Sequence, residues 1–137
     1  MEVVELVGGT GRRVVEGVAS TGARDANRNI LDPLGCCAKL PVRLLIEHDQ
    51  AREIGRVTYL RRSPRCIYIR AAIFSTDAAE AAWSRIVAGE LRGLSVGARD
   101  CHIAAAGTVI TQWNLGEVSI TAVPANRDTT LRIFGGA

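Results

Sequence analysis

Ser95 stands in the stretch GLSVG at 93–97, which matches the G-x-S-x-G pattern of a hydrolase nucleophile. A serine hydroxyl is a poor nucleophile at neutral pH until a neighbouring base takes its proton. Two histidines are available, His48 and His102. His102 follows Ser95 at an odd offset, so on a continuous strand it faces the other side of the sheet. His48, at the polar end of the apolar run VRLLIEHD, is the better candidate base.

The surroundings of Ser95 differ from those of a hydrolase elbow. That motif requires a strand, then a tight turn bearing the serine, then a helix, within a large parallel sheet. Here the expected helix precedes Ser95, a strand follows it, and strands and helices do not alternate. A serine between glycines can also be a tightly packed strand position. Ser95 is therefore a candidate nucleophile only if a base and an acid converge on it.

Glu117 is the candidate acid. If residues 105–107 form a three-residue hairpin loop, Ala104 pairs with Thr108, and the constant register of an antiparallel ladder places Glu117 opposite Ser95 on the same face. A one-residue slip or a bulge would undo this pairing. An exposed strand carboxylate is the alternative. The small, apolar run GEVSITAVPAN around Glu117 favours a carboxylate that has a partner.

The elements that must position these side chains are mostly strands. EVVELV and RRVVEGVAS predict an opening hairpin, and EIGRVTYLRR and RCIYIRAAIF predict a second hairpin around Ser63-Pro64. One helix is expected at about 77–90, with a capping box from Asp77 and Glu80 and a stop near Gly89. Residues 21–41 read as one long connection that could be mobile.

The chain of 137 residues fits one domain, residues 1–137, with 47% hydrophobic and 23% charged residues. The predicted fold class is mainly β or α+β. We expect a mostly antiparallel, closed or partly closed β-barrel of about seven strands, with one main helix at about 77–90 and minor helices.

Charge and cysteine content exclude several other classes. The net charge of +3 comes almost wholly from scattered arginines, and aromatic residues make up only 4%, so nucleic-acid binding is not supported. No apolar run reaches membrane-spanning length. No C-x-x-C spacing occurs, so we expect no metal, no cofactor, and unpaired thiols in the reducing cytoplasm. The cysteines are Cys36, Cys37, Cys66 and Cys101.

Three segments resemble, in order, the signature blocks of the prohead maturation proteases of tailed bacteriophages, relatives of herpesvirus assemblin. They are RLLIEHDQAREIGRV, IVAGELRGLSVGAR and LGEVSITAVPANRD. In that family the first block carries a histidine, the second a serine and the third an acid. The matching positions are His48, Ser95 and Glu117.

The resemblance implies an assemblin-like barrel and a serine endopeptidase with a Ser-His-acid triad and no cofactor. It also implies a role in the host cytoplasm, inside the procapsid. There such enzymes cut the scaffold or the scaffold-like arm of the major capsid protein, and commonly themselves. A homo-oligomer is compatible with it. The alternative is a catalytically silent capsid-assembly or scaffold domain of the same fold.

The chain departs from the family pattern at two places. Residues 24–39 read RDANRNILDPLGCCAK, where the family has an aspartate-small-glycine-aspartate turn leading into a PGAF-like stretch. The substrate-side contacts are therefore expected to differ here. Gly116 stands directly before Glu117, where the family usually has leucine, so we expect a bulge or a looser position for the acid.

Overall fold

The computed structural model describes residues 2–5, 13–104 and 107–135. This part of the chain contains ten strands, one α-helix and one 3-10 helix. The strands are β1 (Glu2–Glu5), β2 (Val14–Thr21), β3 (Ile30–Leu31), β4 (Cys36–Cys37), β5 (Val42–Ile46), β6 (Glu53–Arg62), β7 (Cys66–Ile73), β8 (Gly93–Ile103), β9 (Val109–Thr121) and β10 (Arg132–Ile133), and the helices are η1 (Pro33–Gly35) and α1 (Asp77–Val87).

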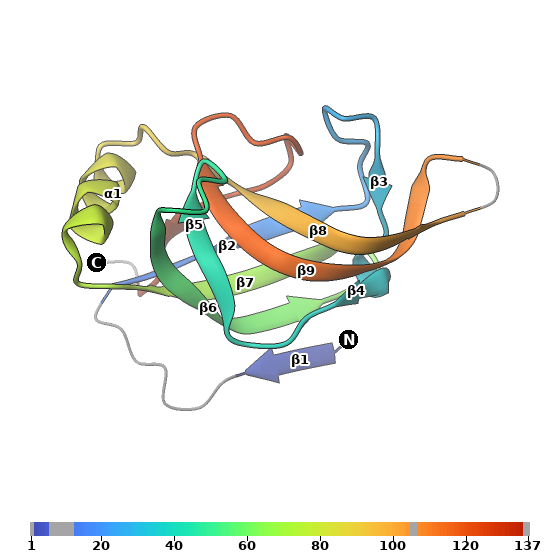
Figure 1. The fold of residues 1–137 in the computed structure, drawn as a ribbon, viewed down its shortest axis with the longest axis horizontal. Coiled ribbons are helices and arrows are strands. Elements are labelled where there is room, and N and C mark those ends of the chain that lie inside the picture. Colours follow the sequence, from blue (N-terminus) through green and yellow to red (C-terminus); the bar gives the residue numbers. More distant parts are fainter. Residues whose placement is uncertain (1, 6–12, 105–106, 136–137) are drawn as a thin grey trace.

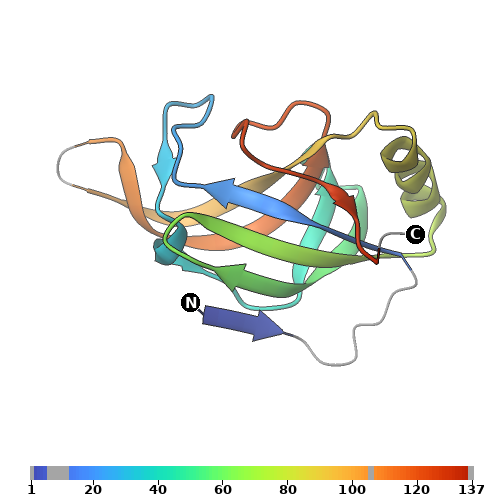
Figure 2. The same ribbon diagram turned by 180° about the vertical axis from the view of Figure 1, so that it is seen from behind.

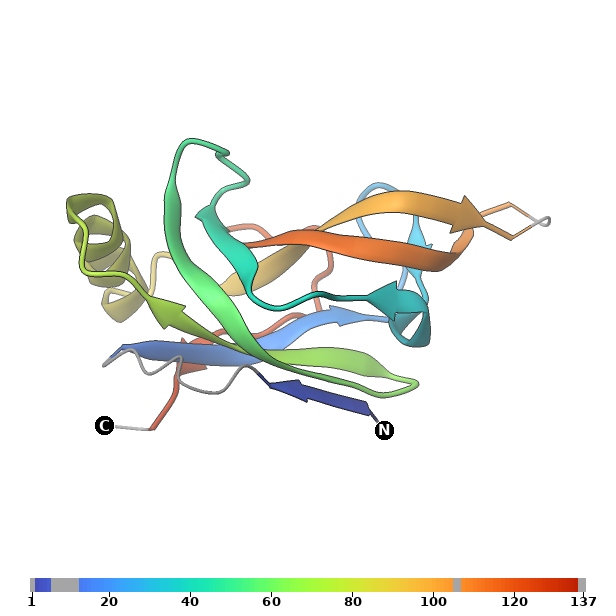
Figure 3. The same ribbon diagram turned by 60° about the horizontal axis from the view of Figure 1, so that its bottom comes forward.

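The strands form one curled sheet in the order β10-β2-β7-β6-β5-β9-β3, with β1 on β6 and both β4 and β8 on β9 (Figure 1). The prediction of a closed or partly closed barrel of about seven strands is therefore confirmed only in part. The described part of the chain has ten strands, and their ladder does not return from β3 to β10, so the sheet is not closed. The sheet is an open one that folds over itself, as the view in Figure 3 shows. The predicted opening hairpin is wrong, because β1 pairs with β6, and its turn at 8–11 lies outside the described residues.

Most pairs are antiparallel, as predicted, and β6 and β7 form the predicted second hairpin. The exceptions lie on β9, which pairs in parallel with β3, β4 and β5. β3, η1 and β4 all lie in the expected connection 21–41. The parallel pairing of β5 with β9 matters for the site, because it sets Leu45 beside Ser119 and Ile46 beside Ile120.

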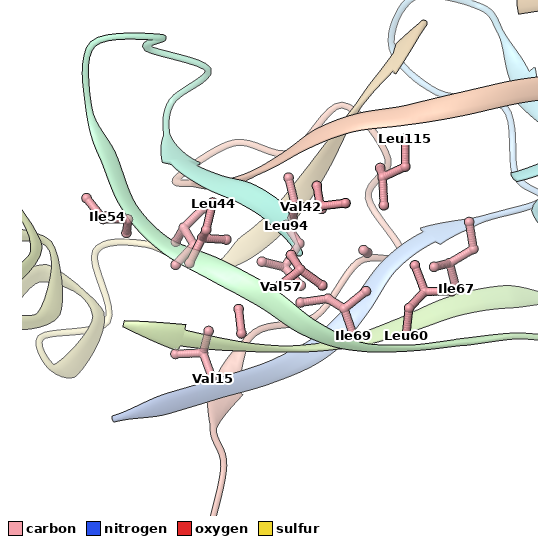
Figure 4. Packing of buried hydrophobic residues seen from close by; sticks show 14 of the residues in the cluster. Val15, Val42, Leu44, Ile54, Val57, Leu60, Ile67, Ile69, Leu94 and Leu115 are labelled. Carbon is pink, nitrogen blue, oxygen red and sulfur yellow. The ribbon is translucent and has the colours of Figure 1, made fainter. Parts of the chain in front are cut away.

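The hydrophobic core lies between the two folded halves of the sheet. Strand β7 alternates between half-buried and buried positions, the pattern of a strand with one face on a core. Figure 4 shows Leu60, Ile67 and Ile69 from β6 and β7 facing Leu94 and Leu115 from β8 and β9. No helix in the described residues is long and apolar enough to cross a membrane.

The N-cap of helix α1 lies one residue before the predicted cap, Asp77. The N-cap is Thr76, whose Oγ1 accepts the Ala79 amide, so the predicted box from Asp77 is wrong. Gly89, at φ 76°, follows the helix in the left-handed conformation that glycine tolerates, as predicted. The helix buries Ala79 and Ile86 at one end of the sheet.

The two halves of the sheet meet without a ladder between β2 and β8, and a short segment bridges them instead. Val18 of β2 exchanges hydrogen bonds with Thr130, at 3.0 Å to the Thr130 amide and 2.9 Å to its Oγ1. The Leu94 amide of β8 donates to Thr129 Oγ1 at 3.3 Å. A Cβ at Gly17 would lie 2.0 Å from the Thr130 carbonyl oxygen, so only glycine allows this approach. Figure 2 shows the segment running past β2 into β10. We call Val18, Leu94, Thr129 and Thr130 the threonine seam.

Candidate active site

His48 lies just beyond the end of β5, on a turn that reverses the chain. Both Glu47 and His48 adopt left-handed conformations, at φ 51° and 59°. Such conformations are uncommon outside glycine and need support from their surroundings. The Glu47 amide donates to the Ile120 carbonyl at 3.0 Å, and the His48 amide donates to Ser119 Oγ at 2.8 Å. These bonds to β9 hold the turn so that the His48 ring reaches back over the sheet.

Ser95 lies on β8 directly opposite Ser119 of β9. Ser95 is 8% exposed, and its hydroxyl oxygen lies 3.0 Å from His48 Nε2. The serine is therefore fixed by the ladder, and the ring comes to it from β5. Of the two candidate histidines, the structure brings His48 to Ser95, whereas His102 pairs with Gln112 far along β8 and is exposed.

Glu117 Oε1 lies 2.8 Å from His48 Nδ1, and its side chain is 12% exposed. The predicted register was wrong by two residues, because Glu117 faces Gly97 rather than Ser95. An even displacement keeps a side chain on the same face of the sheet, so the carboxylate still reaches the ring. The ladder shifts register between Gly97 and Ala98, where Gly116 is the extra residue on β9, so the predicted bulge is present.

Gly93 and Gly97, on either side of Ser95, leave room for the side chains of Pro124 and Glu117. A Cβ at Gly97 would lie 2.3 Å from Glu117 Oε1, and one at Gly93 would lie 2.7 Å from the Pro124 ring. Gly97 is thus the place on β8 over which the Glu117 carboxylate lies. The G-x-S-x-G pattern records close contacts on a strand, not a strand-to-helix elbow.

These three side chains form a directed chain of hydrogen bonds. A carboxylate accepts only, so Nδ1 carries the proton in its bond to Glu117. That tautomer leaves the Nε2 lone pair free to accept the Ser95 hydroxyl proton. The arrangement can therefore remove a proton from Ser95 and stabilise the positive ring that results. No group of three or more histidine, cysteine or acidic residues in the described part of the chain is placed to hold a metal ion.

A cleft of about 480 Å³ opens beside His48 and Ser95. Its walls come from the end of β2, from the loop after it and from the segment 123–126 after β9. These walls are tied together: Asn126 Nδ2 donates to Thr21 Oγ1 at 2.9 Å, and the Ala26 amide donates to the Ala125 carbonyl at 2.9 Å. A polypeptide entering this cleft would meet small side chains on both walls.

Two residues of the site were not identified from the sequence. Ser119 contacts both the His48 amide and Glu117 Oε2, and Glu47 Oε1 accepts the Ala122 amide at 2.8 Å, which links the histidine turn to the cleft wall. Ser119 could have been found in the sequence as a small hydroxyl residue in an apolar strand, two residues after Glu117 and therefore on the same face of the sheet. Arg99, on the same strand as Ser95, packs over Gly116 and has no hydrogen bond to Ser95, His48 or Glu117 among the described contacts.

Comparison with known protein families identifies the family of this chain. Residues 23–134 match the family described as Caudovirus prohead serine protease. The chain belongs to this family of prohead serine proteases. The predicted family is thus confirmed, and the match covers His48, Ser95 and Glu117.

The match with a phage relative concerns only part of that protein. This prohead protease family member is 29% identical over 131 residues to the capsid polyprotein of Pseudomonas phage PAJU2. The match covers 88% of this chain and spans about a fifth, 20%, of the polyprotein.

Solved herpesvirus proteases share the fold of this family member. The protease of Kaposi's sarcoma-associated herpesvirus in complex with a hexapeptide phosphonate inhibitor is 17% identical, with a TM-score of 0.62 over 89% of this chain and 65% of that one. The same protease in complex with a dimer disruptor is 19% identical, with a TM-score of 0.60 over 88% of this chain and 75% of that one. At these identities the likeness concerns the fold, and it supports the assemblin-like part of the fold prediction.

Proposed function

We propose that this chain is a serine endopeptidase of capsid maturation, with Ser95 as nucleophile, His48 as general base and Glu117 as the acid that orients the histidine. The observation that carries the proposal is the continuous pair of hydrogen bonds from Ser95 Oγ to His48 at 3.0 Å and from His48 to Glu117 at 2.8 Å. The adjoining cleft gives a polypeptide access to the serine.

In the proposed mechanism His48 Nε2 takes the Ser95 proton as Oγ forms a bond to the scissile carbonyl carbon. The tetrahedral intermediate then breaks its C–N bond, and Nε2 returns the proton to the leaving amine. Water, deprotonated by the same nitrogen, hydrolyses the acyl-enzyme and regenerates Ser95. Glu117 holds the Nδ1 proton throughout and balances the charge of the imidazolium.

We propose the major capsid protein or its scaffold as the substrate, cut inside the procapsid in the host cell, with self-cleavage by the same site. Membership of the prohead serine protease family supports this setting. The capsid polyprotein of Pseudomonas phage PAJU2 adds support, because a segment similar to this chain is part of a polypeptide named for the capsid.

Treatment of the purified protein with a fluorophosphonate tests the proposed activity. The probe is expected to add covalently to Ser95, because an activated serine displaces fluoride from phosphorus. Trypsin cleavage after Arg92 and Arg99 releases residues 93–99, in which Ser95 is the sole hydroxyl residue, so mass spectrometry reads the site directly. Absence of labelling in the folded protein would instead favour the silent capsid-assembly domain.

Replacing Gly97 by alanine is expected to lower the rate of fluorophosphonate labelling roughly 10- to 100-fold, because loss of one oriented catalytic hydrogen bond costs about that much. The new methyl group would overlap the Glu117 carboxylate, which lies 2.3 Å from the Cβ position. The overlapped atoms belong to the end of the Glu117 side chain and not to the backbone, so the carboxylate can be displaced without breaking the ladder of β8 and β9. The rate should therefore fall while the melting temperature changes little.

Gly22 provides the matched control for this substitution. A Cβ at Gly22 would meet no atom within 4 Å, so Gly22→Ala is expected to leave the labelling rate unchanged. Equal labelling rates for Gly97→Ala and Gly22→Ala would show that the position of Glu117 is unimportant for the activation of Ser95.

A further inference from the structure

We propose that Ser119 is a positioning residue that fixes the histidine and the acid of the site at the same time; this inference rests on the proposed function. Its hydroxyl accepts the His48 amide at 2.8 Å and donates to Glu117 Oε2 at 3.1 Å. One oxygen atom thus joins the backbone of the base to the side chain of its partner. Ser119 is not among the residues that line the cleft, and the described hydrogen bonds do not join it to Ser95 Oγ, so we infer that it acts through its two neighbours.

The first action of Ser119 is on the carboxylate. Glu117 Oε1 faces His48 Nδ1, and Oε2 faces the Ser119 hydroxyl. A carboxylate held by one oxygen alone can rotate about its terminal bonds, whereas a hold on both oxygens fixes its plane. The donated hydrogen bond therefore keeps Oε1 directed at the ring.

The second action of Ser119 is on the turn that carries the ring. His48 adopts a left-handed conformation at φ 59°, which a residue other than glycine rarely keeps without outside support. The Ser119 oxygen is the acceptor for its amide proton. Loss of that acceptor leaves a partly buried N–H without its partner and loosens the turn.

The fold leaves little that could replace the hydroxyl. Ser119 has no exposed surface, and its strand is paired on both sides, with Ser95 on β8 and with Leu45 on β5. An alanine at 119 would leave a space the size of one oxygen atom, enclosed by these strands, which is small for a bound water. Both hydrogen bonds are therefore expected to be lost together.

Nitrogen NMR of the histidine rings tests the inference without relying on catalysis. The chain has two histidines, so His102, which is exposed, is an internal reference for His48. At mildly alkaline pH the wild-type His48 ring is expected in the tautomer protonated at Nδ1. In Ser119→Ala the His48 signals should broaden and move toward the mixed tautomers of His102. Unchanged His48 signals would overturn the proposal.

A double-mutant cycle on fluorophosphonate labelling tests the same point kinetically. Ser119→Ala alone is expected to slow labelling roughly 10- to 100-fold, as lost supporting hydrogen bonds do at other sites. In a Glu117→Ala background the same substitution should add less than about threefold, because the residues act as one unit. A full, additive effect in that background would overturn the proposal, since it would mean that Ser119 acts independently of the acid.

Tyr68→Phe is the matched control for both measurements. The Tyr68 hydroxyl donates to Glu16, outside the lining of the cleft, and this bond holds the pKa of Glu16 below its usual value. The substitution therefore removes another O–H to carboxylate hydrogen bond, and it should change neither the His48 signals nor the labelling rate. If the wild type takes up no label, the proposed function fails, whereas the NMR comparison still decides the role of Ser119.

Discussion

Cleavage of a co-expressed capsid protein is expected to fall by about 10⁴-fold or more when Ser95 is replaced by alanine, the scale seen when a serine nucleophile is removed from a hydrogen-bonded triad. Ser119, which lies opposite Ser95 on the facing strand, is not expected to take its place, because it is fully buried and bonded to Glu117. The proposed chemistry needs the Ser95 oxygen itself, so little activity should remain. Gel analysis of capsid processing over time gives the rate.

The controls for this experiment separate chemistry from folding. Ser84→Ala removes an exposed hydroxyl on α1 that bonds only to the Glu80 carbonyl, so it should leave processing at the wild-type rate. The Ser95→Ala protein should melt near the wild-type temperature, because it loses one hydrogen bond and no apolar packing. Capsid protein processed at equal rates by Ser95→Ala and wild type would end the peptidase proposal.

Replacing His48 by asparagine is expected to lower the same cleavage rate by about 10⁴-fold. Asparagine is chosen because it tolerates the left-handed conformation that His48 adopts at φ 59° better than most residues. The backbone turn and its bond to Ser119 should therefore persist, while the group that takes the Ser95 proton is lost. The effect should appear in kcat, with KM little changed.

His102→Asn supplies the comparison for this variant, because it removes the second histidine at an exposed position away from the cleft. Combining His48→Asn with Ser95→Ala should be no worse than Ser95→Ala alone, since the two side chains serve one step. Retention of more than about a tenth of the wild-type rate by His48→Asn would contradict the role of general base.

The sequence was sufficient to predict the strand-rich class, the helix and the hairpin of β6 and β7, because each rests on local periodicity. Local periodicity does not determine which strands pair with each other. Val3 pairs with Arg61 of β6, whereas hydrophobic alternation favoured pairing with the next strand along the chain. The sequence also left open whether the barrel would be closed or partly closed, because closure depends on how far the sheet curls, which leaves no local pattern.

For the candidate site, the residue types and the face of the sheet on which Glu117 lies were predictable from the sequence. The register between β8 and β9 was not. Glu117 was expected opposite Ser95, and Ser119 holds that position instead. The hairpin loop was assumed to leave Ala104 opposite Thr108, whereas the Ala104 amide bonds to the Val109 carbonyl, and the Gly116 bulge adds a further shift. Residues 105 and 106 of that loop lie outside the described residues. Two displacements sum to an even offset, so the acid kept its face.

The threonine seam has a consequence for how the molecule opens. Neighbouring strands in a ladder separate cooperatively. Among the described hydrogen bonds, β2 and β8 are linked instead through Thr129 and Thr130. Thr129 lies three residues after the cleft wall at 123–126, and β8 carries Ser95. This edge of the sheet beside Ser95 is thus closed by side-chain hydrogen bonds of two threonines and not by a ladder. We therefore expect it to open locally more readily than the ladders of β9 with β5 and with β8, which align His48 and Glu117.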